Sequence, residues 1–91
     1  MADFARAVSF VQQHTMLFTS TLSDARQLEY YAHYKQAVHG RPVGDAPSIF
    51  DPRGRAKFRA WEKLGGLSAD RAKHIYVEML TADFPFWQKR V

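Results

Sequence analysis

Apolar side chains near the start of the chain recur with the period of an α-helix. Phe4, Ala7, Val8 and Val11 follow the i, i+3, i+4, i+7 spacing of one helical face, with polar residues between them. This spacing predicts a first helix. The segment 14–22 loses the period and is rich in Thr and Ser, so we expect a connection there rather than a helix.

The middle of the chain contains start and stop signals for a second helix. Ser23 is a suitable N-cap, and Asp24 places an acidic side chain in the first turn. The predicted helix covers residues 24–39, and Gly40 follows at the position where a helix commonly ends. The next segment, 40–52, contains three prolines and two glycines, which predict a long loop.

A third helix is predicted to begin at the end of this loop. Asp51 is its N-cap and Pro52 its first residue, because proline is well tolerated at that position. The apolar positions continue through Trp61 and Leu64, and Gly65 with its glycine neighbour predicts the end.

A fourth helix is predicted after Ser68, a second candidate N-cap, and Pro85 should end or kink it. One apolar stripe of this helix comprises Ala72, Ile75, Tyr76 and Met79. The tail after Phe84 is aromatic and then basic, so its rings either fold back onto the core or form an exposed adhesive end.

No alternating strand pattern or internal repeat competes with these helices, so the sequence predicts an all-α fold. With 91 residues, one domain covering residues 1–91 is expected, and the lack of cysteine means that packing must stabilise it. The net charge of +4 favours an anionic partner, but the basic residues are dispersed among acids and do not require nucleic acid. No apolar stretch approaches the roughly 20 residues of a membrane span, and the start lacks the features of a signal peptide, so we expect a cytoplasmic protein.

The motifs of common catalytic and metal sites are missing. The four histidines form no i, i+4 pair, and without cysteine the usual zinc spacings cannot occur, so no metal site is predicted. The glycines match neither the dinucleotide fingerprint nor the phosphate loop. Ser23 and Ser68 are explained as helix caps rather than nucleophiles. We therefore expect no catalytic residue, no cofactor and no enzyme.

Two helical faces carry side chains suited to binding a phosphorylated ligand. Tyr31, Tyr34 and Lys35 share one side of the second helix, and Arg53 and Lys57 lie one turn apart on the third. The simpler interpretation is that the tyrosines are core rings with hydrated hydroxyls and that the cations are solvated. Taken together, rings for stacking and cations for phosphate indicate a nucleotide-like ligand, without separating a free nucleotide from a nucleic acid.

Three stretches of the chain resemble the acyl-CoA-binding protein family. Residues 31–37, Tyr-Ala-His-Tyr-Lys-Gln-Ala, are similar to the signature of that family's second helix. Residues 54–61, Gly-Arg-Ala-Lys-Phe-Arg-Ala-Trp, are similar to the signature of its third helix, and residues 64–68 resemble the linker that follows. The resemblance covers most of residues 4–80. It implies a four-helix bundle with a skewed up-down-down-up arrangement.

The resemblance also implies a ligand and roles for individual residues. Family members bind acyl-CoA thioesters without making or breaking a bond. Tyr31, Lys35 and Lys57 would hold the 3′-phosphate of the CoA ribose. Tyr34 and Tyr76 would embrace the adenine, although spacing alone favours a core position for Tyr76.

Some positions depart from the family pattern. Arg53 lies where some relatives have a further basic contact, whereas Gln12 or Gln13 stands where a Lys or Arg often approaches the phosphates. Phe58 replaces a usual Trp. Gln27 occupies a position where a larger apolar residue often lines the acyl groove.

The resulting hypothesis is an intracellular carrier that binds medium- to long-chain acyl-CoA and passes it to acyl-CoA-using enzymes in lipid metabolism. On this hypothesis the protein is a monomer without a nucleic-acid partner or integral membrane association. The alternative is a helical interaction module that binds nucleic acid or a protein through its basic face and aromatic tail.

Overall fold

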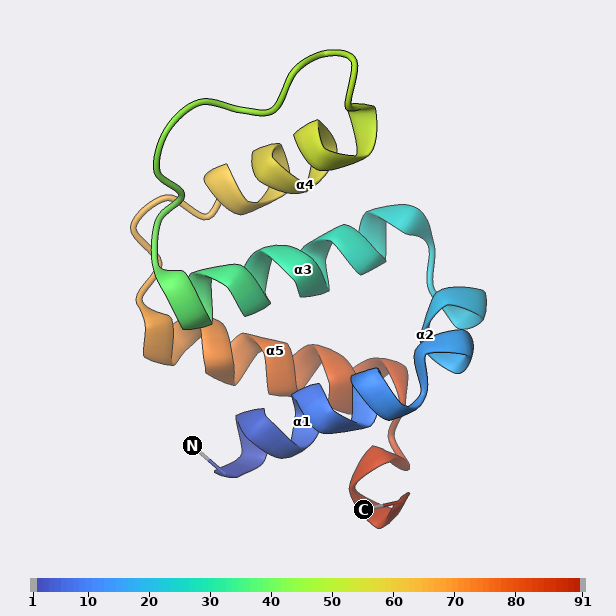
Figure 1. Ribbon diagram of the computed structural model, residues 1–91. Coiled ribbons are helices and arrows are strands. Elements are labelled where there is room, and N and C mark those ends of the chain that lie inside the picture. Colours follow the sequence, from blue (N-terminus) through green and yellow to red (C-terminus); the bar gives the residue numbers. More distant parts are fainter. Residues whose placement is uncertain (1, 91) are drawn as a thin grey trace.

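The structure, a computed structural model, describes residues 2–90 (Figure 1). These residues form helices and connecting loops without a β-strand. The elements are α1 (Ala2–Gln13), α2 (Thr15–Thr21), α3 (Asp24–His39), α4 (Pro52–Glu62), α5 (Ala69–Asp83) and a terminal 3-10 helix, η1 (Trp87–Arg90). The predicted all-α class is confirmed.

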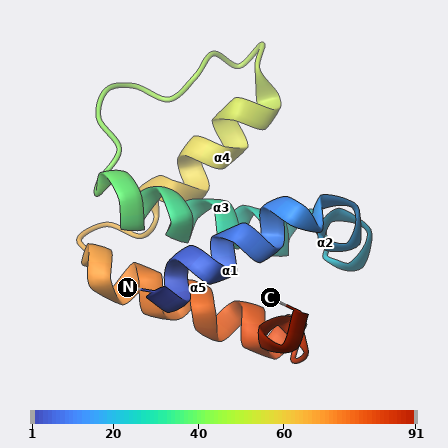
Figure 2. The same cartoon turned by 60° about the horizontal axis from the view of Figure 1, so that its bottom comes forward.

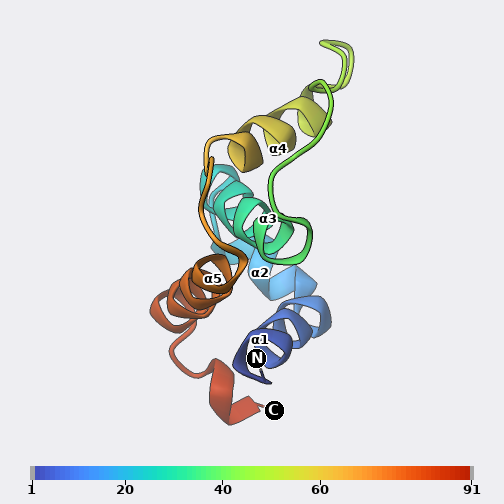
Figure 3. The ribbon, with the colours of Figure 1, turned by 90° about the vertical axis from the view of Figure 1, so that its left-hand side faces the viewer.

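The four longer helices form a bundle with the up-down-down-up arrangement. In Figure 1, α1 and α5 run in one direction, and α3 and α4 both run in the other. Viewed along the helices in Figure 3, α4 lies above α3, which lies above α5 and α1. α3 packs extensively against both α4 and α5, and α1 packs against α5. α3 is therefore the central helix of the molecule.

Local capping explains where three of the helices begin. The hydroxyl of Ser23 accepts a hydrogen bond from the backbone N–H of Arg26 at 3.1 Å, and Ser68 accepts one from Arg71 at 3.0 Å. The Asp51 carboxylate accepts one from Gly54 at 3.1 Å. Each bond satisfies a backbone donor that has no partner within its helix.

Two predictions about the helices are wrong: one helix was missed, and another ends earlier than expected. The segment 14–22, expected to be a connection, contains the short helix α2, which buries Phe18. Serine and threonine hydroxyls in α2 bond to backbone carbonyls three residues earlier, so these polar residues do not prevent a helical turn. α4 ends at Glu62 rather than continuing through Leu64, and turns follow up to Gly66.

The core is aromatic, and the tail after α5 completes it. Phe10, Leu80, Phe84 and Trp87 are all at most 2% exposed. The indole N–H of Trp87 donates to the Thr81 hydroxyl at 3.0 Å. η1 thus packs against the middle of α1 and lies at the end of α5 (Figure 2). Of the two expectations for the tail, the structure selects the one in which its rings fold back onto the core.

A candidate ligand cavity lined by all five α-helices

Side chains from α1, α2, α3, α4 and α5 line a cavity of about 750 Å³. It extends along α3 from Asp24 to Tyr34. Val8 and Val11 of α1 contribute to one wall, and the first two turns of α4 contribute to another. Such a volume lies within the range of small-molecule sites. The bundle arrangement creates this space because α4 contacts α3 but buries none of its own residues completely.

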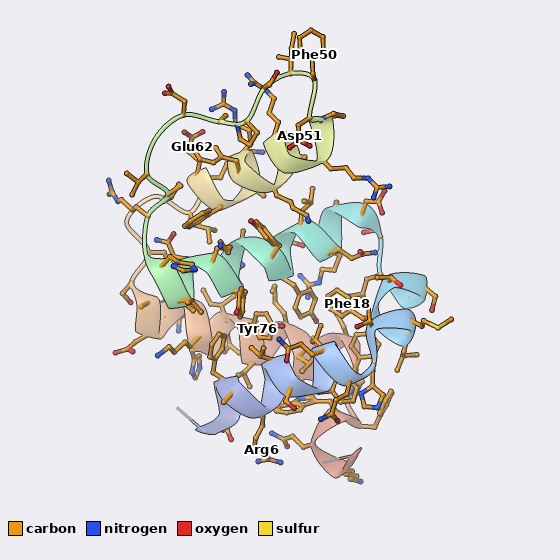
Figure 4. All side chains as sticks on the ribbon, viewed as in Figure 1. Arg6, Phe18, Phe50, Asp51, Glu62 and Tyr76 are labelled. Atoms are coloured by element: carbon orange, nitrogen blue, oxygen red, sulfur yellow. The ribbon has the colours of Figure 1, made fainter. Side chains whose placement is uncertain are left out.

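A continuous series of five aromatic rings runs through the bundle, and all of them except Phe4 line one wall of the cavity. Tyr34 stacks on Phe4 with ring centroids 6.3 Å apart, and Phe4 meets Tyr76 edge to face at 5.3 Å. Tyr76 then contacts Tyr30 at 5.3 Å, and Tyr30 contacts Phe18 at 4.9 Å. Figure 4 marks Tyr76 in the interior and Phe18 where α2 joins the bundle. This wall offers ring surfaces for stacking and an apolar path toward α2.

Two of the wall phenols remain protonated over a wide pH range. Burial raises the pKa of Tyr76 well above its ordinary value, and the neighbouring Tyr34 raises it further. Burial and the hydrogen bond to Asp83 raise the pKa of Tyr30 in the same direction. Both phenols are therefore neutral at physiological pH.

Cations of α4 face the tyrosines of α3 across the cavity. The Nζ atom of Lys57 lies 5.3 Å from the centroid of the Tyr31 ring, a cation–π contact. Arg53, one turn earlier on α4, also lines the cavity. The opening between α3 and α4 therefore combines positive charge with phenol rings, which suits a phosphate next to an aromatic base.

Lys35 is the candidate that the structure separates from the others. Its Nζ atom lies 5.2 Å from the centroid of the Trp61 ring and lines a second, more open hollow of about 520 Å³. Lys35 is one helical turn after Tyr31, on the same face of α3, so the conformation of its side chain and not its helical position separates it from the cavity. In this conformation Lys35 extends over the Trp61 ring and does not line the cavity.

The other five candidates, Tyr31, Tyr34, Arg53, Lys57 and Tyr76, all line the cavity. The sequence did not reveal that Tyr30, Leu28 and Phe18 line it as well. Phe18 was missed because α2 was missed. Tyr30 is adjacent in sequence to Tyr31, but only the packing of α3 shows that both contribute.

The end of the cavity nearest α2 is polar. The amide nitrogen of Gln27 donates to the carbonyl of Thr19 at 3.2 Å and to that of Leu22 at 2.9 Å. Thr19 and Asp24 line the same end. Gln27 is therefore held in place, and it closes an otherwise apolar path with an amide.

One buried amide holds α4 against the rest of the bundle. Gln36 is 1% exposed, and its amide nitrogen donates to the carbonyls of Gly65 at 3.0 Å and Leu67 at 2.7 Å. Its amide oxygen accepts a hydrogen bond from the Trp61 indole at 3.1 Å, and that indole also donates to the Gly40 carbonyl at 2.7 Å. These bonds fix α4, and with it Arg53 and Lys57, relative to α3.

Neither a metal site nor a membrane-spanning helix is found among residues 2–90. No group of three or more His, Cys, Asp or Glu side chains is arranged to hold a metal ion there. In the same range, no helix has the length and apolar character required to span a membrane.

The fold and the cavity define a four-helix bundle with an aromatic and cationic candidate ligand site. A family model described as "Acyl CoA binding protein" matches residues 1–80. The chain belongs to the acyl-CoA-binding protein family.

Individual relatives agree with this assignment. The chain is 32% identical over 85 residues, 92% of its length, to Acyl-CoA-binding domain-containing protein 1 of Arabidopsis thaliana, of which it covers 25%. It is 35% identical over 75 residues, 82% of its length, to Acyl-CoA-binding domain-containing protein 4 of Homo sapiens, of which it covers 28%. The chain thus spans about a quarter of the length of these curated relatives.

Solved structures show the same fold. The solution structure of an acyl CoA binding protein from Babesia bovis superposes with a TM-score of 0.78 at 32% identity, and 96% of each chain is covered. The crystal structure of Oryza sativa Acyl-CoA-Binding Protein 2 gives a TM-score of 0.75 at 25% identity, again with 96% of each chain covered. The predicted four-helix arrangement is confirmed.

Proposed function

We propose that the chain binds medium- to long-chain acyl-CoA thioesters non-covalently in the cavity along α3. The observation that carries this proposal is the combination of one aromatic wall with the Lys57–Tyr31 pair at the opening between α3 and α4. The names of the relatives support acyl-CoA as the ligand.

In this proposal each part of the ligand has a matching part of the cavity. Lys57 and Tyr31 hold the 3′-phosphate through charge-assisted hydrogen bonds, with Arg53 as a further cation. The adenine stacks against Tyr34 and Tyr76. Lys35 joins the phosphate by rotating about its own side-chain bonds away from Trp61, which a flexible lysine can do.

The acyl chain then lies along the apolar part of the cavity toward α2. Burial of each methylene contributes about 0.8 kcal/mol, so affinity rises with chain length while the path remains apolar. The gain ends where the chain reaches the amide of Gln27, because covering a polar group opposes burial.

We further propose that the ligand is carried and not transformed. The described residues that line the cavity include neither serine nor histidine, and the Thr19 hydroxyl is bonded to the Met16 carbonyl at 3.3 Å. The chain would act as one acyl-CoA-binding domain, a monomeric cytoplasmic carrier that supplies acyl-CoA-using enzymes. The aromatic tail that the alternative interaction module would use is largely buried at Phe84 and Trp87.

Calorimetric titration with CoA and with octanoyl-, dodecanoyl- and palmitoyl-CoA tests the proposal. We expect affinity to rise along this series. Lys57→Ala should weaken binding of every acyl-CoA by roughly tenfold to a hundredfold, because it removes a charged hydrogen-bond donor. Lys63→Ala is the matched control, since Lys63 follows α4 directly and does not line the cavity.

The outcomes separate the function from the residue assignment. If no acyl-CoA binds, the proposed function is wrong. If acyl-CoA binds and Lys57→Ala binds as tightly as the unmodified chain, the function stands and the phosphate assignment is wrong.

A further inference from the structure

Most of the net positive charge of the chain lies in one quarter of the sequence. Residues 40–63, the long loop with α4 and its C-cap, contain six Lys or Arg and three Asp or Glu. The rest of the chain contains seven Lys or Arg and six Asp or Glu. The loop and α4 therefore carry three of the four net positive charges.

The same region exposes two adjacent large apolar side chains. Ile49 is 70% exposed and Phe50 is 90% exposed. They occupy the centre of a turn in which the backbone N–H of Asp51 donates to the Ser48 carbonyl at 2.9 Å. In Figure 4 the Phe50 side chain projects from the extremity of the molecule, beyond α4, and Figure 3 shows the loop extending away from the bundle.

The turn is held in this position by contacts on both sides. The Phe50 backbone N–H donates to the Ser48 hydroxyl at 3.1 Å. The Arg55 guanidinium donates to the Pro47 carbonyl at 2.9 Å and so attaches the loop to α4. Asp51 caps α4 directly after the turn. The exposed apolar pair is thus presented by a defined turn.

We propose that this turn docks on the surface of a lipid bilayer that contains anionic headgroups. Ile49 and Phe50 enter the interface between headgroups and acyl chains, and the exposed cations at the start of α4 contact the headgroups. The exposed cations nearest the turn are Arg53 and Lys57 on the first two turns of α4, and Arg41 and Lys63 lie at the other end of α4.

A bilayer fits this surface better than a folded protein does. The two apolar side chains project from a convex turn, whereas stable protein interfaces require a broad complementary surface with a packed centre. A fluid interface accepts an isolated wedge without a matching pocket. The charge balance of residues 40–63 supplies the attraction that two apolar side chains alone would lack.

The position of the turn adds a reason for this arrangement. Pro52 and Arg53, which line the ligand cavity, follow Phe50 within three residues. Docking would therefore bring the cavity opening close to the bilayer. The docking itself does not depend on which ligand the cavity binds.

Cosedimentation with vesicles tests the proposal on the full chain without ligand. We expect binding to vesicles of phosphatidylcholine with one-third phosphatidylserine, weak binding to phosphatidylcholine alone, and a loss of binding as salt increases. The double variant Ile49→Ser/Phe50→Ser should bind the anionic vesicles roughly tenfold more weakly. Its thermal unfolding should be unchanged, because both side chains are exposed.

Met16→Ser is the matched control. Met16 is 85% exposed but lies on α2, away from residues 40–63, so this variant should bind vesicles like the unmodified chain. Absence of binding to anionic vesicles at low salt would overturn the proposal. Equal binding of the double variant, or an equal loss in Met16→Ser, would overturn the role of the turn.

Discussion

Asp83 closes the network that joins the end of α5 to the start of α3. Its carboxylate accepts hydrogen bonds from Arg26 Nε at 2.8 Å and from the Tyr30 hydroxyl at 2.7 Å. A carboxylate in the last position of a helix is unfavourable next to the negative end of the dipole, so these donors are needed. Partial burial raises the pKa of Asp83, but the hydrogen bonds from Arg26 and Tyr30 outweigh this effect, and the pKa is lowered.

This network should make stability depend on pH in the acid range. Because the pKa of Asp83 is lower in the folded state than in the unfolded chain, its contribution is present above the unfolded value of about 4 and is lost as pH falls through the folded value. We expect Asp83→Asn to lower the free energy of unfolding by about 1–3 kcal/mol at neutral pH. Urea unfolding at neutral pH and at about pH 3 should show this difference shrinking in acid.

Asp45→Asn provides the control for loss of charge alone. Asp45 is exposed in the loop, so its unfolding free energy should stay within about 0.5 kcal/mol of that of the unmodified chain. A difference for Asp83→Asn that is constant with pH would contradict the assigned role.

At the residue scale, roles that depend on nearby sequence were predictable. The three N-caps Ser23, Asp51 and Ser68 were predicted correctly because a cap and its backbone partner lie three residues apart. Gln36 gave no such signal, since its carbonyl partners are 29 and 31 residues away. The direction of the Lys35 side chain could not be predicted from helical spacing either, because it depends on where Trp61 packs.

At the element scale, η1 covers one side of the aromatic core. Trp87 is fully buried, and its ring lies edge to face with Phe10 at a centroid distance of 6.4 Å. The Arg6 guanidinium lies 5.9 Å from the centroid of the same ring. η1 follows the part of the chain that the family model matches, residues 1–80. η1 therefore adds core packing from outside the matched region.

Removing the indole should destabilise the whole bundle. We expect Trp87→Ala to reduce the free energy of unfolding by about 3–5 kcal/mol, because it leaves a cavity against α1 and removes a partner of Thr81. Gln88→Ala, an exposed neighbour in the same element, should change it by less than about 0.5 kcal/mol. Chemical denaturation measures both values, and a loss below about 1 kcal/mol for Trp87→Ala would show that η1 is not part of the core.

Whether the sequence predicted a helix depends on how that helix is stabilised. α3 was predicted with the boundaries that the structure shows, because a cap, an acidic first turn and a terminal glycine all lie on the chain itself. α2 has none of these signals. Its N-cap His14 makes no side-chain capping bond, and Phe18 is its one buried residue, so tertiary packing determines this helix.

At the scale of the molecule, α4 differs from the other three long helices because it adds no residue to the buried core. The core cluster draws its buried residues from α1, α2, α3, α5 and the tail, whereas α4 contains no buried residue. Its attachment depends on Trp61 and the buried amide of Gln36. α4 should therefore open locally at a lower free energy than the remaining helices.

Hydrogen exchange can measure this difference directly. We expect the amides of α4 to exchange through an opening that requires less free energy than the opening of α3 and α5. Saturation with palmitoyl-CoA should slow exchange in α4 more than elsewhere, because the proposed ligand joins α4 to α3. Equal exchange free energies in α4 and α5 without ligand would contradict this division.

The candidate site was predictable in its composition and only partly in its geometry. The resemblance identified five side chains that line the cavity, and helical spacing placed Tyr31 with Tyr34 and Arg53 with Lys57. The apolar path was not predictable, because it requires the packing of α1, α2 and α3 together. Gln27 could be identified as unusual, but the two carbonyls that hold it became apparent only in the folded chain.

The parallel course of α3 and α4 sets a lower limit on the length of the segment between them. Because consecutive helices run in the same direction, residues 40–51 must return along the whole of α4, which has 11 residues and a length of about 16 Å. Five fully extended residues reach about 17 Å at most. The segment 40–51 is longer than this minimum, and the additional residues allow it to form the turn that presents Ile49 and Phe50. Ile49 and Phe50 can be substituted without changing the path of the backbone because their side chains are exposed, whereas a deletion that approaches the limit would force α4 to reverse.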